Sequence, residues 1–162
     1  MTMSEPAANA NFREVDDEAR GIARGLLAEA RFGALGVMLE GAPFVTRIAL
    51  NAEGGLISLV STLSQHTAAL KATPRCSLLI GEPGIKGDPL THPRLTLQAD
   101  AELVGRDDTL RARWLKIHPK AKLYIDFGDF GFVRFQVRAA FLNGGFGYAC
   151  RLSNDDIALS QG

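Results

Sequence analysis

The alternation of apolar and polar positions predicts a chain built mainly of short β-strands. Apolar runs of five to seven residues recur through the middle of the chain, separated by turns rich in Gly, Pro and Asn. We expect strands over 34–39, 44–50, 56–60, 76–80, 94–103 and 132–137, the last continued by 139–142. Six or so strands joined mostly by short turns predict a closed antiparallel barrel.

Helical spacing of apolar residues interrupts this pattern in three places. One helix is expected from Asp16-Asp17 to a point before Gly33, and another from Asp107 to about His118, where Pro119 ends it. A short helix is expected between Ser64, a plausible N-cap, and Lys71. The fold class is therefore mainly β (α+β), with a flexible N-terminus over 1–15, one domain over 16–150 and a polar tail over 151–162.

Composition and charge exclude several classes of protein. The chain has 18 Lys+Arg and 18 Asp+Glu, and this zero net charge gives no general reason to expect nucleic-acid binding. No apolar run approaches the roughly 20 residues that span a bilayer, and the start lacks the features of a secretion signal, so we expect a cytoplasmic protein. Cys76 and Cys150 have no CxxC spacing, and the three histidines lack metal-ligand spacing, so neither a disulfide nor a metal site is expected.

The segment 61–71 is the strongest candidate for binding chemistry. It brings the hydroxyl groups of Ser61, Ser64 and Thr67, the imidazole of His66 and the start of a helix to the end of a strand. Free N–H groups and the helix dipole at such a point favour an anion, which predicts a phosphate site. The alternative interpretation is a capped surface helix whose hydroxyl groups are solvated.

Three further features allow two interpretations each. Arg47 lies in an apolar strand and either binds an anion or faces solvent, and Arg94 raises the same question. The loop 84–93 carries Lys86 and is longer than a hairpin needs, which favours a function over a simple connection. The glycine-rich stretch 144–147 lacks the strand-turn-helix setting of a dinucleotide site, so it is interpreted as a flexible turn.

The order of short motifs resembles the pyridoxamine 5'-phosphate oxidase-like FMN-binding split barrels. Those motifs are Ala30-Arg31-Phe32-Gly33-Ala34-Leu35, Pro43-Phe44-Val45-Thr46-Arg47, Ser64-Gln65-His66-Thr67 and Pro74-Arg75-Cys76-Ser77-Leu78-Leu79. The segments 86–98, 124–130 and 144–147 resemble the haem-utilisation (HugZ-like) branch of that family. The resemblance covers about residues 18–148 and implies a six-stranded antiparallel split barrel with Greek-key topology, forming a homodimer with FMN at the subunit interface.

The resemblance also assigns cofactor-binding positions. They are Arg47, Ser61, Thr62, Ser64, Gln65, His66, Thr67, Lys86 and, from the partner chain, Arg94. Basic residues occupy the positions of Gln65 and His66 in the oxidases themselves, so neutralisation of the phosphate here would rest on Arg47, hydroxyl groups and Lys86.

Three functions follow as expectations. The first is an FMN-dependent oxidoreductase that acts on a small molecule. The second is a protein of the haem-utilisation type that binds or degrades haem, and the third is a non-catalytic flavin-binding module. No side chain stands out as a catalytic acid or base.

Overall fold

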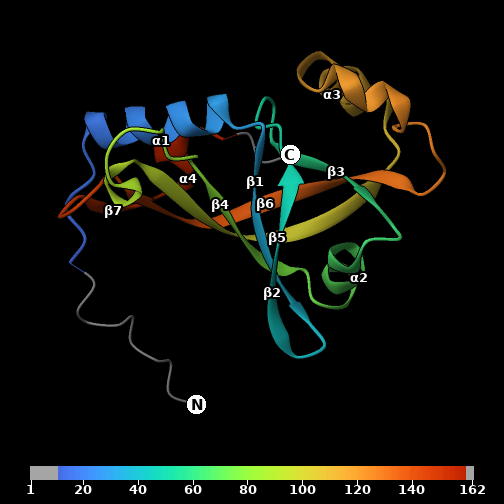
Figure 1. The fold of residues 1–162 in the computed structure, drawn as a ribbon, viewed down its shortest axis with the longest axis horizontal. Helices are drawn as coiled ribbons and strands as arrows, with labels where there is room; N and C mark the ends of the chain where they lie inside the picture. Colours follow the sequence, from blue (N-terminus) through green and yellow to red (C-terminus); the bar gives the residue numbers. More distant parts are fainter. Residues whose placement is uncertain (1–10, 160–162) are drawn as a thin grey trace.

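The computed structural model describes residues 11–159, a seven-stranded antiparallel sheet with a few helices around it (Figure 1). The expected flexible N-terminus falls largely on residues 1–10, which lie outside the described residues. The elements in chain order are α1 (Asp17–Glu29), β1 (Phe32–Leu39), β2 (Ala42–Ala49), β3 (Leu56–Ser61), α2 (Gln65–Ala72), β4 (Arg75–Ile80), η1 (Pro89–Thr91), β5 (Arg94–Gly105), α3 (Asp108–Ile117), η2 (Pro119–Leu123), β6 (Phe130–Asn143), β7 (Ala149–Leu152) and α4 (Asn154–Ile157).

The sheet curls into a barrel that is split along one seam. Its strand order is β2-β1-β4-β5-β6-β3, with β7 added on β6. The two ends of this order meet where Asn51 bridges to Ile57 and where the Ser58 hydroxyl donates to the Ala49 carbonyl oxygen at 2.6 Å. No further ladder pairs join β2 to β3 within the described residues, so the two strands part beyond this corner. The expected six-stranded split barrel is confirmed, and its neighbour order places β4 beside β1 and β3 beside β6, as Greek-key connections do.

The barrel interior is filled by alternate residues of each strand. Leu35 and Val37 of β1 point inward, as do Leu95 and Leu97 of β5 and Phe135 of β6, and all five are buried. The helix α1 lies across one end of the barrel (Figure 1) and contributes its buried face, formed by Ala19, Ala23 and Leu27. The helix begins where Asp16 accepts a hydrogen bond from the Ala19 N–H at 2.8 Å, which is the N-cap that the acidic pair predicts.

A second apolar cluster fixes α3 on the outside of the barrel. Trp114 is 1% exposed and packs edge-on against Phe132, while its indole stacks on His118 with ring centroids 4.3 Å apart. The His118 Nε2 donates to the Leu50 carbonyl oxygen at 2.8 Å. This contact ties the end of α3 to the end of β2, next to the barrel's closing corner.

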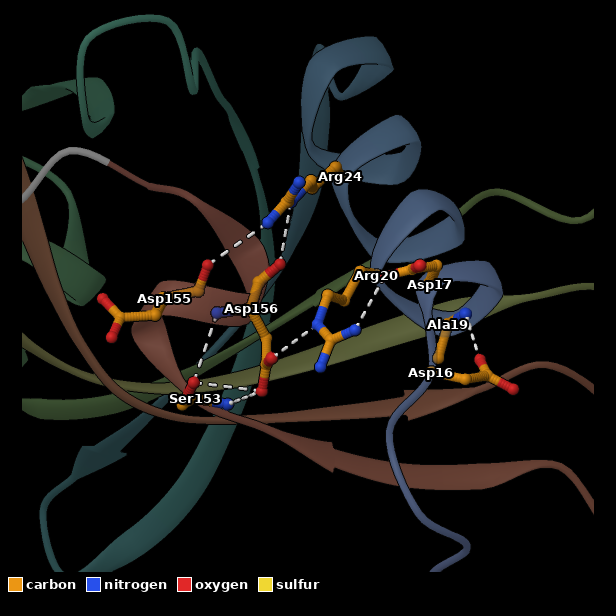
Figure 2. A network of polar contacts seen from close by, with 8 residues as sticks. All are labelled: Asp16, Asp17, Ala19, Arg20, Arg24, Ser153, Asp155 and Asp156. Atoms are coloured by element: carbon orange, nitrogen blue, oxygen red, sulfur yellow. Dashed lines mark hydrogen bonds and ion pairs between the residues drawn. The ribbon is translucent and has the colours of Figure 1, made fainter.

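Residues 149–159 belong to the folded unit rather than to a separate polar tail. Cys150 and Leu152 of β7 are buried, and so is Ile157 of α4. Figure 2 shows α4 held against α1: Arg20 Nε donates to Asp156 at 2.9 Å, and Arg24 Nε donates to the Asp156 carbonyl oxygen at 2.8 Å. The domain boundary expected at residue 150 therefore falls inside a strand, because the alternation over 149–152 is too short to be recognised in the sequence.

Cys76 and Cys150 are both buried free thiols. Residues 11–159 hold no cluster of three or more potential metal-ligating side chains. Among these residues, no helix is long and apolar enough to cross a membrane.

Candidate functional site

The segment 61–67 is folded around its own hydroxyl groups. Thr67 is 1% exposed, and its Oγ1 donates to the Ser61 carbonyl oxygen at 2.6 Å. The Ser61 hydroxyl donates to the Asp129 carboxylate at 2.5 Å and accepts the Leu63 N–H at 3.1 Å. A hydroxyl group has one proton to donate, so neither Ser61 nor Thr67 retains a donor for a ligand.

The start of α2 remains open for hydrogen bonding. Ser64 takes the N-cap position, as the sequence predicts, but its side chain makes no capping hydrogen bond. The N–H groups of Gln65 and His66 have no acceptor among the described residues, as usual for a helix start without a side-chain cap. The exposed Gln65 side chain makes no hydrogen bond there either, and Thr62 contributes its N–H to the Asp129 carbonyl oxygen at 2.8 Å.

His66 adds no positive charge to this segment. Its ring is half-buried, and its Nε2 is buried without a hydrogen-bond partner. Burial lowers the pKa of His66 below its usual value of 6.5. The imidazole is therefore neutral at pH 7 and offers no positive charge to a phosphate.

The structure places Arg47 in a pocket of about 560 Å³ beside β1, β2 and β4. No described hydrogen bond or ion pair joins it to the segment 61–67. If the pairing of Asn51 with Ile57 continued along the seam, Arg47 would lie opposite Ser61, but β2 and β3 part before that point. The Arg47 guanidinium carbon instead lies 5.5 Å from the centre of the Phe32 ring.

The same pocket contains a second arginine that the sequence analysis did not select. Arg31 follows α1, and its Nη1 donates to the carbonyl oxygens of Ala28 and Ala30 at 3.0 and 3.2 Å, which leaves its other N–H groups available. The apolar wall consists of Leu26, Phe32, Ala34, Val45 and Leu79, and the carboxylates of Glu29 and Glu82 also line the pocket. The position of Arg31 just after a helix does not indicate a binding role, because the residues that share the pocket with it are distant in sequence.

Lys86 lies in the loop between β4 and β5, and Arg94 is the first residue of β5. The His92 Nδ1 accepts the Gly84 N–H at 3.2 Å, so the Nε2 carries the proton and donates to the Lys86 carbonyl oxygen at 2.7 Å. The Arg94 Nη1 donates to the Leu90 carbonyl oxygen at 3.0 Å. Within one chain, these contacts shape the loop, and no described contact brings either side chain to the segment 61–67.

The side chains of the segment 61–67 do not suit the phosphate of FMN. Two of its four hydroxyl groups, those of Ser61 and Thr67, are committed, its histidine is neutral, and the Asp129 carboxylate lies against Ser61. A flat, largely apolar ligand with acidic groups fits the Arg31–Arg47 pocket better, since that pocket combines apolar walls with two guanidinium groups.

Comparison with known proteins finds relatives whose names describe them as heme proteins. No family model matches the chain. The chloroplastic heme oxygenase HOZ of Arabidopsis thaliana is 45% identical over 92 residues, which make up 54% of this chain and 27% of that protein. The solved structure of a heme binding protein from Mycobacterium smegmatis is 30% identical, with a TM-score of 0.78, over 90% of this chain and 62% of that one. The chain thus spans about a quarter of the curated relative and less than two thirds of this solved one.

Other solved structures extend the fold likeness. One chain is 44% identical with a TM-score of 0.81, covering 90% of this chain and 99% of that one. A putative pyridoxamine 5'-phosphate oxidase from Listeria innocua is 15% identical with a TM-score of 0.63, over 78% of this chain and 98% of that one, which shows the shared fold alone.

The split seam, the strand order and these likenesses show that the chain has the fold of the pyridoxamine 5'-phosphate oxidase-like split barrels. Two relatives at 30% identity or above are named as a heme oxygenase and a heme binding protein.

Proposed function

We propose that this chain is a haem-binding protein that holds the porphyrin in the pocket between Arg31 and Arg47. The observation that carries the proposal is the pocket itself: about 560 Å³, with Phe32, Val45 and Leu79 on its wall and two guanidinium groups at its edge. A porphyrin is a flat apolar ring with two carboxylates, so the wall would contact the ring and the arginines would pair with the propionates. The named relatives bind or oxidise haem, which supports this ligand over a flavin.

The pocket of one chain lacks a side chain suited to the haem iron. None of its described lining residues is His, Cys, Met or Tyr. When bound, haem would supply redox chemistry at its iron, while this chain's residues would orient the ring and neutralise its carboxylates. An axial ligand, where one is used, would then come from outside the lining of this single-chain pocket.

We further propose that a second copy of the chain covers the pocket. The outward side chains of Phe32 on β1, Val45 on β2 and Leu79 on β4 are 42%, 69% and 46% exposed, and these three strands are neighbours in the sheet. An apolar face of neighbouring strands left in water is typical of an interface between subunits. Small residues between them, Ala34 and Gly36, keep this face flat.

Titration with haemin tests the ligand. We expect a Soret shift that saturates at one haem per chain and an affinity that falls about tenfold in Arg47→Ala, because one charge-assisted pair is lost. Arg113→Ala is the matched control, since Arg113 is an exposed arginine of α3 outside the pocket, and it should bind haemin as the wild type does. Equal loss in both variants, or no saturable Soret shift, would refute the proposal. Decay of the Soret band on adding ascorbate in air would show degradation in addition to binding.

Light scattering tests the dimer. Val45→Glu should convert the wild-type dimer to a monomer, because it places a charge on the apolar face, whereas Leu123→Glu changes an equally exposed leucine of η2 and should leave the mass unchanged. A monomeric wild type would refute the proposed pairing.

A further inference from the structure

The carboxylate of Asp129 contacts the first residue of the segment 61–67, to which the resemblance assigns cofactor binding. It accepts a hydrogen bond from the Ser61 hydroxyl at 2.5 Å, and the Asp129 carbonyl oxygen accepts one from the Thr62 N–H at 2.8 Å. The segment before β6 is thereby fastened to the end of β3 by side chain and backbone together. Ser61 and Asp129 are 68 positions apart, so only the fold brings them together.

No positive side chain of the neighbouring segment offsets this carboxylate. Residues 61–67 contain no Lys or Arg, and His66 is neutral for the reason given above. The remaining donors are the hydroxyl groups of Thr62 and Ser64 and the free N–H groups of the first turn of α2. A dianion at this point would have weak dipolar donors on one side and a full negative charge on the other.

We propose that Asp129 is a specificity-determining residue that holds the Ser61 hydroxyl and excludes ligands carrying a terminal phosphate, FMN among them, from the start of α2. A phosphate oxygen within hydrogen-bonding distance of Ser61 Oγ would lie within about 5 Å of the Asp129 oxygen. At that separation the repulsion between a phosphate dianion and a carboxylate weakens binding about tenfold or more, even in a solvated cleft. The proposal relies on the haem function only for the ligand that takes the place of FMN.

Comparison of FMN with riboflavin isolates the phosphate, because the two molecules share the same ring. We expect Asp129→Asn to bind FMN at least tenfold more tightly than the wild type, with riboflavin affinity changed less than twofold, measured by quenching of flavin fluorescence. Asp126→Asn is the matched control: it removes the same charge from the same segment, but Asp126 pairs with Arg111 at 2.7 Å instead of Ser61. This control should leave both affinities at the wild-type value.

The salt dependence of the wild type gives a second measurement that needs no variant. Salt screens repulsion, so FMN should bind more tightly as ionic strength rises, opposite to a site that captures phosphate with cations. The proposal is overturned if Asp129→Asn gains affinity for FMN and riboflavin equally, if neither protein binds FMN at millimolar concentration, or if salt weakens FMN binding by the wild type.

Haemin titration of the same three proteins separates this inference from the proposed function. Unchanged haemin affinity in Asp129→Asn together with a gain for FMN supports both. If the wild type fails to bind haemin, the haem function fails, while the ratio of FMN to riboflavin affinities still decides the role of Asp129.

Discussion

Thr67→Val isolates one hydrogen bond of a buried hydroxyl group. Thr67 is 1% exposed, and its Oγ1 donates to the Ser61 carbonyl oxygen at 2.6 Å. Valine keeps the shape of the side chain but removes the donor. The Ser64 N–H still donates to the same oxygen at 3.1 Å, so the oxygen keeps one partner. The loss of free energy of unfolding should therefore lie near the typical net value of one hydrogen bond, about 1 kcal/mol, rather than the larger cost of an orphaned group.

Thermal unfolding measures this loss. For a chain of this size, about 1 kcal/mol corresponds to a fall in Tm of roughly 2–4 °C. Thr109→Val is the matched control, because it is the same substitution at an exposed position of α3. There we expect the free energy of unfolding to change by no more than about 0.5 kcal/mol.

The alternative is that the Thr67 hydroxyl serves a bound phosphate, as the sequence motif implies. In that case Thr67→Val would unfold like Thr109→Val and would instead lose affinity for FMN relative to riboflavin. That pair of results would refute the structural role assigned to Thr67.

Three further predictions concern titratable groups. Because burial lowers the pKa of His66, the unfolded chain binds a proton at this residue at higher pH than the folded chain does. The free energy of unfolding should therefore fall as pH drops from 6.5 toward the folded pKa. His66→Leu should flatten this part of the pH profile measured by urea unfolding. The pKa of Asp156 is lowered by the Ser153 N–H, the Arg20 guanidinium and the Ser153 hydroxyl. Asp156→Asn should therefore destabilise the protein by about 1 kcal/mol at pH 7 and progressively less as pH falls below 3.8. Differential scanning calorimetry measures this loss, with Asp155→Asn as the unaffected control. Burial raises the pKa of Cys76 to about 12, so its thiol should react with a disulfide reagent at pH 8 only after unfolding; rapid reaction in the native protein would contradict this burial.

The strands and helices were predictable because their signals are local. The strand expected over 34–39 is observed as Phe32–Leu39, and the helix expected from Asp107 is observed as Asp108–Ile117 with Asp107 as its N-cap. In both, the periodic burial of apolar side chains acts within a few residues, and so does the Asp107 carboxylate that caps the helix. The barrel class also followed, since short turns between strands force antiparallel neighbours.

The chemistry of the site was less predictable because it depends on contacts between distant residues. The sequence marks Ser61 as a free hydroxyl group at a helix start, and only the fold shows that its proton goes to Asp129. It likewise marks Arg47 as a strand arginine, while the pocket that Arg47 shares with Arg31 depends on the pairing of β1 with β2 and on the end of α1. The apolar residues of the segment 124–130 follow no helical or strand period, so nothing local indicated that Asp129 contacts the end of β3.

The split seam explains how one barrel can accommodate different ligands. The contacts that close it, the Asn51–Ile57 bridge and the Ser58 hydrogen bond, lie at one end of the seam. The side chains that we propose to set ligand preference, Arg47 and Asp129, lie where β2 and β3 have already parted, so they carry little of the barrel's closure. A change such as Asp129→Asn therefore alters charge at the site without breaking a ladder hydrogen bond, and ligand preference can shift while the fold persists. A large loss of stability in Asp129→Asn, beyond the roughly 1–3 kcal/mol expected for its hydrogen bond to Ser61, would show that the ligand end of the seam also supports the barrel.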